Sequence, residues 1–146
     1  MMDIKWTKEL SVGNEVIDSE HMNLIGLTNG VVHAILKRDC AALAQAFEML
    51  EDRLHAHFVN EEKIALAAEF DYSKHKQAQL YSLRELRHMR DELLAKNCVW
   101  GDGTVDHFTR SLRNWMIDGH IVKLDMQMKP ALLSRPCDFK NIADQK

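Results

Sequence analysis

Proline and glycine are scarce in this chain of 146 residues, which contains only two prolines and six glycines. Both residue types interrupt helices, whereas alanine, leucine, glutamate and lysine, which favour helices, are abundant. The sequence therefore predicts an all-α protein. At this length we expect one domain with a sizeable buried core.

No charge of either sign dominates, because 19 lysines and arginines face 22 aspartates and glutamates, for a formal net charge of -3. This balance gives no reason to expect a nucleic acid or an anionic membrane as a partner. No run approaches the roughly 18 apolar residues of a membrane-spanning helix. The opening MMDIKWTKEL has no apolar segment typical of a secretion signal. We therefore expect a cytoplasmic location.

Cysteine is also scarce. Cys40, Cys98 and Cys137 are odd in number, widely spaced and form no CxxC motif. This pattern favours free thiols in a reducing cytosol over a disulfide framework or a zinc ribbon.

Four segments carry apolar residues at steps of three and four, which is typical of amphipathic helices. Their bounds follow from capping side chains, turn residues and a positively charged helix end. Short connections between them predict an up-down-up-down four-helix bundle over about residues 19–128. The four helices are expected from Asp18 or Ser19 to Lys37-Arg38, from Asp39 to the turn at 69–73, from Asp71 or Ser73 to the loop at 96–103, and from about Thr104 to Met128.

The two ends of the chain lack this period. Residues 1–18 are expected to form an ordered arm packed on the bundle. Pro130 and Pro136 bound a short helical or irregular tail, expected to lie along the bundle. No repeat or low-complexity tract marks a second domain, so we expect residues 1–146 to form a single domain.

Polar residues interrupt one of the apolar faces. His57 and Glu61 fall on the stripe that otherwise carries Leu50, Leu54 and Ile64, so both should point inward. Burying a carboxylate is costly unless it is paired or bound to a cation. Taken alone, the spacing of the two residues favours a solvated pair one turn apart over metal ligation.

The other helices supply similar residues: His21 near the start of the first, His75 at the head of the third, and His120 and Asp125 in the fourth. Four imidazoles and two carboxylates spread over four helices are what a dinuclear metal centre buried in a bundle requires. Nitrogen ligands cap each metal in such centres, and carboxylates bridge the pair. The whole ordered set therefore favours metal ligation over solvated pairs.

Asp125 follows His120 by five positions, which places the two roughly 140° apart on an ideal helix. Both can face one centre only if they flank it or if the helix loosens locally. Gly119 beside His120 favours a π-bulge, a feature frequent at functional sites.

These motifs resemble the bacterial hemerythrins. The opening segment from Trp6 to Leu24, with LSVG and IDSEH, resembles the N-terminal signature of the family. HFVNEE at 57–62 matches its HFxxEE, and WMIDGHIVKLD at 115–125 resembles its WL…HIxxxD. The resemblance covers residues from about 6 to 128 in the same order.

The resemblance implies a four-helix bundle around a non-haem di-iron centre that binds O2 reversibly. Its cofactor would be two bridged iron ions. The implied ligands are His21 and His57 on the iron that takes O2, His75 and His120 on the second iron, and Glu61 and Asp125 as bridges.

The chain departs from the family at Gln79, because the third helix of the family carries HxxxH from the position of His75. The segment from His57 to His75 is also one residue shorter than usual, and that from Trp115 to His120 one longer. Gln79 can ligate iron, bond a water ligand, leave the position open or be an ordinary polar residue. A more open iron would favour autoxidation, peroxide or NO chemistry, or partial metal loading.

The remaining candidates have ordinary interpretations. Glu62 is turned about 100° from Glu61 and should be solvated. Phe58 and Trp115 are expected in the core, where they can also wall an O2 pocket. Four further histidines are expected to be exposed or capping: His33, His55, His88 and His107.

The predicted function is that of a cytoplasmic, monomeric O2 carrier, store or deliverer. The alternatives are a sensor or signalling module for O2, redox state or NO, and a di-iron oxidase or peroxidase. At this length we expect no appended output domain, which counts against a sensor. Enzymes of related bundle type use more carboxylates, so a ligand-binding protein is expected rather than an enzyme.

Overall fold

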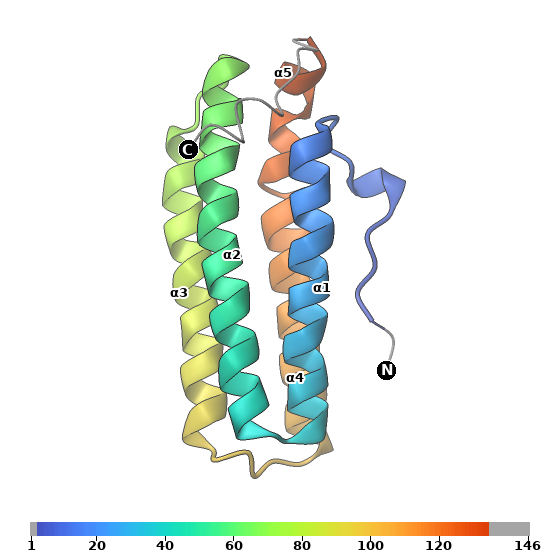
Figure 1. Ribbon diagram of the computed structural model, residues 1–146, viewed down its shortest axis with the longest axis vertical. Helices are drawn as coiled ribbons and strands as arrows, with labels where there is room; N and C mark the ends of the chain where they lie inside the picture. Colours follow the sequence, from blue (N-terminus) through green and yellow to red (C-terminus); the bar gives the residue numbers. More distant parts are fainter. Residues whose placement is uncertain (1–2, 135–146) are drawn as a thin grey trace.

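A computed structural model of the chain describes residues 3–134, which form an all-α four-helix bundle without strands (Figure 1). The connections α1–α2 and α3–α4 lie at one end of the bundle and α2–α3 lies at the other, as the predicted up-down-up-down topology requires. The elements are η1 (Lys8–Leu10), α1 (Glu15–Lys37), α2 (Cys40–Ala67), α3 (Ser73–Ala95), α4 (Asp102–Arg113), η2 (Asn114–Val122), η3 (Asp125–Met128) and α5 (Lys129–Ser134).

Helix α1 begins earlier than the sequence predicted. Its N-cap is Asn14, whose side chain accepts from the backbone N–H of Ile17 at 2.9 Å. The expected cap, Asp18, instead accepts from the Ser11 hydroxyl at 2.6 Å and the Val12 backbone N–H at 2.9 Å. Asp18 therefore ties the arm to the helix, and the prediction of a cap at Asp18 or Ser19 was wrong.

The next two helix starts depend on aspartate side chains. Asp39 caps α2 as predicted, accepting from the Ala42 backbone N–H at 3.1 Å. At α3, Asp71 accepts from the Ser73 backbone N–H at 3.1 Å and from the Ser73 hydroxyl at 2.8 Å. The position directly before α3 is Tyr72, whose side chain points elsewhere.

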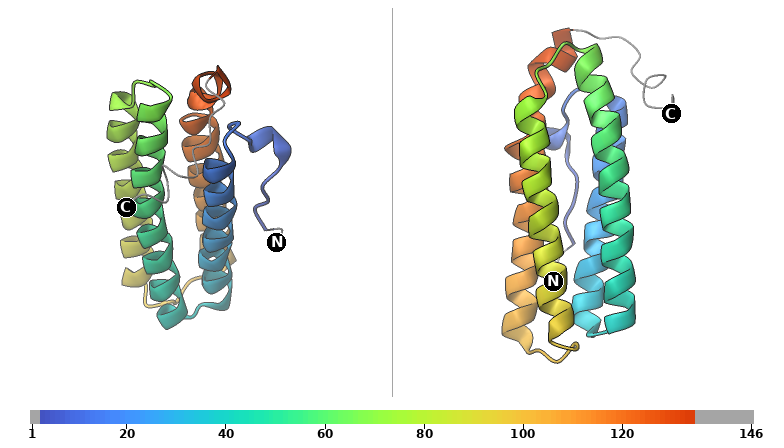
Figure 2. Two further views of the ribbon diagram at one scale, coloured as in Figure 1. Left: turned by 45° about the horizontal axis from the view of Figure 1, so that its top comes forward. Right: turned by 90° about the vertical axis from the view of Figure 1, so that its left-hand side faces the viewer.

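The arm is ordered, as expected, and lies beside α1 outside the bundle (Figure 2). The Asn29 side chain of α1 holds the arm through two hydrogen bonds to Ile4. It accepts from the Ile4 backbone N–H at 2.9 Å and donates to the Ile4 carbonyl at 2.8 Å. The predicted tail contains the short helix α5, and Pro136 lies outside the described residues.

Two apolar clusters fill the bundle. The larger includes Leu24, Leu54 and Phe58, and the smaller includes Ile17 and Ile64. On α1, His21 falls between Ile17 and Leu24, and on α2 Glu61 falls between Phe58 and Ile64. The polar positions predicted from the sequence therefore lie at the boundary between the two clusters.

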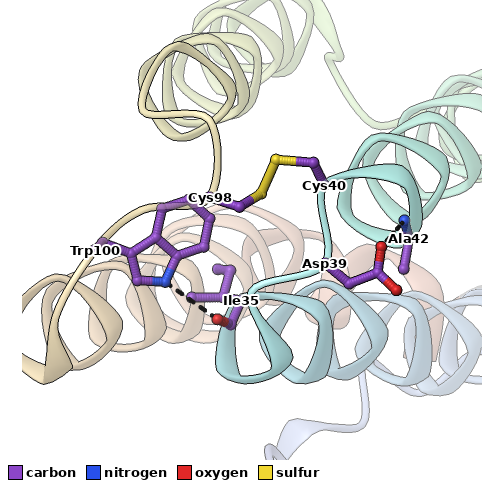
Figure 3. Close-up of a disulfide and its surroundings, with 6 residues drawn as sticks. All are labelled: Ile35, Asp39, Cys40, Ala42, Cys98 and Trp100. Carbon is purple, nitrogen blue, oxygen red and sulfur yellow. Dashed lines mark hydrogen bonds between the residues drawn. A yellow bond between two sulfur atoms is a disulfide. The ribbon is translucent and has the colours of Figure 1, made fainter.

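Cys40 and Cys98 form a disulfide, which corrects the expectation of free thiols (Figure 3). Their Cα atoms are 5.7 Å apart although 58 residues separate them in sequence. The topology brings the start of α2 and the loop after α3 to the same end of the bundle, and spacing alone cannot reveal such a pairing. Cys137 lies outside the described residues. Among the described helices, none combines the length and apolar character that a membrane crossing needs.

Candidate metal centre

Five of the six predicted ligands meet inside the bundle: His21 of α1, His57 and Glu61 of α2, His120 of η2 and Asp125 of η3. Each offers one ligand atom, and these atoms all lie within 4.8 Å of one another. All five side chains are essentially inaccessible to solvent. Each helix turns the interrupting polar residue inward because the flanking residues on the same face are apolar.

One carboxylate oxygen lies at the centre of the three imidazoles. Asp125 Oδ2 is 2.7 Å from His21 Nε2, 3.0 Å from His120 Nε2 and 3.5 Å from His57 Nε2. His57 Nε2 also lies 2.9 Å from Glu61 Oε2 and 3.2 Å from His120 Nε2. This arrangement directs three ring nitrogens and two carboxylates at a common point. We call these five residues the three-histidine cluster.

The π-helix η2 brings His120 and Asp125 to the same side. Its wider turn replaces the regular α-helix from Asn114 to Val122, and the Lys123 backbone N–H bonds to the Asp118 carbonyl at 3.0 Å, five residues back. The local loosening expected beside Gly119 is therefore confirmed. It lets residues five apart contribute to one site, which an ideal α-helix does not.

Burial and neighbouring charges set the protonation of the cluster. Burial lowers the pKa of His21 to about 4. Burial also opposes the charged form of His57, but the Glu61 charge and the bonds to Asp125 and Glu20 outweigh it and raise the pKa of His57 well above its ordinary value. Burial and the Asp125 charge raise the pKa of Glu61 to about 7.

Asp125 is held ionised by its neighbours. Burial opposes its charge, but His120 and the hydrogen bonds from His21 and His57 hold the pKa of its carboxyl well below the usual range. An ionised carboxylate and an imidazole with a low pKa, side by side without solvent, offer strong donors to a cation.

Glu20 supports the cluster from outside and was not predicted from the sequence. Its Oε1 accepts from His57 Nδ1 at 2.7 Å, and its Oε2 accepts from the Asn60 amide at 2.7 Å. Metal-binding histidines commonly donate their second N–H to a carboxylate, which fixes the ring. In the sequence, this rule could have indicated Glu20 as a supporting residue, because Glu20 is the acidic residue next to His21.

His75 and Gln79 are buried close by but do not join the three-histidine cluster. His75 Nε2 lies 3.0 Å from the Leu124 carbonyl and 4.0 Å from Asp125 Oδ1. The Gln79 amide donates to Glu61 Oε1 at 3.3 Å and also to the Tyr72 hydroxyl.

Tyr72 is a second residue that the sequence did not single out. It is buried, and its hydroxyl donates to Glu61 Oε1 at 2.9 Å. Burial, followed by the Glu61 charge, raises the pKa of the Tyr72 hydroxyl above its ordinary value. Tyr72 lies in the turn before α3, where no helical period indicates which way a side chain points.

Most residues that were expected to lie outside the site are exposed or partly exposed, as predicted. His55, His88 and His107 are exposed, and exposed His33 bonds to Asp3 at 2.8 Å. Glu62 is partly exposed rather than fully solvated, and it pairs with Lys76 at 2.8 Å.

The two aromatic residues expected in the core are buried. The Phe58 ring lies 5.9 Å from that of His57 and 5.6 Å from that of His120, between centroids. The Trp115 indole donates to the Ser82 carbonyl at 3.0 Å. The Phe58 ring therefore covers one side of the His57 and His120 rings.

The donor set fits a metal ion. Glu61 Oε2 and Asp125 Oδ1 are buried and accept no hydrogen bond within the described part of the chain. Leaving a charged oxygen buried and unsatisfied is costly, and a cation removes that cost. Mixed imidazole and carboxylate ligands suit iron among the transition metals.

Fold and cluster together define a four-helix-bundle protein with a buried histidine–carboxylate site. No family model matches the chain. It is 26% identical over 119 residues to bacteriohemerythrins of Pseudomonas aeruginosa (strains LESB58 and UCBPP-PA14) and of Pseudomonas paraeruginosa (strain DSM 24068 / PA7), a span of 81% of this chain and 74% of each relative. The similarity and the cluster support a hemerythrin-like family for this chain and suggest that it binds iron.

Proposed function

We propose that the protein is a di-iron O2-binding protein of hemerythrin type that carries, stores or delivers O2. The observation that supports this proposal is the three-histidine cluster, in which imidazoles from three helices surround one buried carboxylate. Glu61 and Asp125 each have a second oxygen, so each can bridge two metal positions. The proposed ligands are His21, His57, Glu61, His75, His120 and Asp125.

The side chains around the centre have separate roles in this proposal. When bound, the iron pair supplies the electrons that reversible O2 binding needs. Glu20 holds the His57 ring through Nδ1, which leaves Nε2 directed at the cluster. Phe58 packs on the His57 and His120 rings, and exclusion of water from the buried site would hinder side reactions such as loss of a proton or hydrolysis.

Histidine-rich ligation favours binding over oxidation chemistry. The proposed set has four imidazoles and two carboxylates, whereas ferritin-like di-iron proteins take a glutamate from each of two helices and a Glu-x-x-His pair from each of the others. A sensor for O2, redox state or NO would use the same site. A partner protein that binds only one ligand state of the centre would distinguish a sensor from a carrier.

The proposal includes a monomer folded as a single hemerythrin-like domain, located in the cytoplasm. The Cys40–Cys98 disulfide bears on the location, because a reducing cytosol keeps most such pairs reduced. Trapping free thiols in intact cells and counting them decides whether the pair is oxidised where the protein works.

Anaerobic reconstitution with ferrous iron, followed by iron counting and optical spectra under O2 and after its removal, tests the function. We expect two irons per chain and a spectrum that changes and reverts. His21→Ala should lose metal, while His33→Ala, an exposed histidine on the same helix, should not. At most one tightly held metal, or tetrahedral zinc, would contradict the di-iron proposal.

A further inference from the structure

The two carboxylates of the centre each present one oxygen to the three imidazoles and the other to a different set of residues. Glu61 Oε2 faces His57, and Asp125 Oδ2 faces all three ring nitrogens. Glu61 Oε1 instead contacts Tyr72 and Gln79, and Asp125 Oδ1 lies nearest His75. The centre therefore has two sides, and only one of them is rich in histidine.

The second side is poor in nitrogen ligands. His120, which the family resemblance places on the second iron, lies with His21 and His57 on the first side. Within residues 3–134, His75 is the one imidazole near the second side. Gln79 stands where the resemblance calls for another imidazole. A metal on this side would therefore have a ligand position that no imidazole fills.

The Tyr72 hydroxyl lies on the side of the centre where this ligand position falls. It lies 2.9 Å from Glu61 Oε1, closer than the Gln79 amide nitrogen at 3.3 Å. Its ring stacks on that of His75, with centroids 5.2 Å apart and planes 26° apart. The ring also packs in the smaller apolar cluster, so its orientation is fixed.

A second observation marks this side as a cation site. Asp125 Oδ1 is completely buried and accepts no hydrogen bond from any described residue. His75 Nε2 lies 4.0 Å from this oxygen, too far for a hydrogen bond but compatible with a shared cation.

We propose that Tyr72 is an oxygen ligand of the second metal position, together with His75, Glu61 and Asp125. This inference rests on the proposed di-iron function. On binding, the Tyr72 O–H bond breaks, an oxygen–metal bond forms, and the proton is released to solvent. Phenolate is a hard anionic ligand suited to ferric iron, as the tyrosine ligand of catalase haem illustrates.

Gln79 is a positioning residue in this arrangement. Its amide N–H donates to the Tyr72 oxygen, and a phenolate oxygen accepts such a bond better than a neutral hydroxyl. Gln79→Ala should therefore shift the phenolate signal described below without removing it.

The chain allows a clean test because it contains only two tyrosines, Tyr72 and the exposed Tyr81. Iron-loaded, air-oxidised protein is examined for a phenolate-to-iron charge-transfer band and for phenolate vibrations in resonance Raman spectra excited in that band. We expect both signals in the wild type and in Tyr81→Phe. Tyr72→Phe should lose both signals and bind its second iron at least about tenfold more weakly, while the first iron stays.

The outcomes separate the two proposals. Two irons and reversible oxygenation without a phenolate signal in Tyr81→Phe would overturn the assignment of Tyr72 and leave the function standing. No iron binding in any variant would overturn both. If Tyr72→Phe does not fold, Tyr81→Phe still decides, because any phenolate signal in it must come from Tyr72.

Discussion

At the scale of single residues, the His57 ring is held from both sides. Nδ1 donates to Glu20 on α1, and Nε2 faces Glu61 one turn further along α2. The Glu20 contact joins two helices at the level of the centre, so it fixes the ring before any metal arrives. Because the ring is already oriented, metal binding loses less conformational entropy at His57.

Glu20→Gln tests that support. The amide keeps the size of the side chain but loses the charge that holds the His57 N–H, so we expect metal affinity to fall about 10- to 100-fold with the fold unchanged. Competition with a chelator of known affinity measures the effect. Ser19→Ala, at the exposed position next to Glu20, is the control and should bind metal as the wild type does.

Glu61 and Glu62 form a second matched pair. Glu61 is fully buried and faces both sides of the centre, so Glu61→Ala should cost both metals and the stability that metal binding confers. Glu62→Ala loses a partly exposed ion pair with Lys76, worth about 0–1 kcal/mol. Iron counting and thermal unfolding with and without iron measure both. Equal effects would show that Glu61 does not hold metal.

Residues that interrupt a regular apolar stripe could be predicted from the sequence, and residues that reach the centre from a turn or from off the inward face of a helix were not. Glu61 was identifiable because a glutamate among leucines at helical spacing needs a cation or a partner. Tyr72 follows a turn, where no period indicates its direction. Glu20 lies off the inward stripe of α1 and reaches His57 only through its side-chain conformation.

At the scale of elements, the π-helix η2 determines what the fourth helix can contribute. Its extra residue carries His120 and Asp125 to one side of the bundle, while Phe108 and Leu112 of α4 keep their places in the core. The five-residue spacing and Gly119 indicated such a feature in the sequence. Its extent, from Asn114 to Val122, depends on packing against the other helices and was not predictable.

Shortening and lengthening the segment between His120 and Asp125 by one residue should have opposite effects on metal binding. Deleting the half-exposed Val122 places Asp125 four positions after His120, a turn of roughly 400° on a regular α-helix, so both stay on one face. An alanine inserted after Val122 rotates Asp125 a further 100° or so, away from the centre.

We therefore expect the deletion variant to retain metal and the insertion variant to lose it, with helix content similar in both by circular dichroism. Iron per chain, measured on purified protein, is the deciding quantity. Loss of metal in the deletion variant together with retention in the insertion variant would contradict this account of the π-helix.

At the scale of the whole molecule, helical periodicity together with short connections predicted the four-helix bundle, because each helix has one continuous apolar face to bury. The disulfide had no such signal. Cys40 begins α2, and Cys98 lies in the loop between α3 and α4, so their meeting follows from the assembled topology rather than from any local pattern.

The disulfide and the metal centre should act on stability independently. Along α2, Cys40 and His57 are 17 residues apart, or roughly 26 Å at 1.5 Å per residue, so the disulfide lies far from the centre. The disulfide constrains a long loop of the unfolded chain, and its loss should lower the free energy of unfolding by about 2–4 kcal/mol. Metal content should not change.

Denaturant unfolding of the wild type, Cys40→Ser, Cys98→Ser and the double variant measures this contribution. The two single variants should be equally destabilised, and the double variant little more, because either substitution alone already breaks the bond. A thiol reductant should bring the wild type down to the same level. Additive losses in the double variant would mean that the two cysteines stabilise the bundle as separate core residues. Release of iron by the reductant would mean that this end of the molecule is coupled to the metal centre.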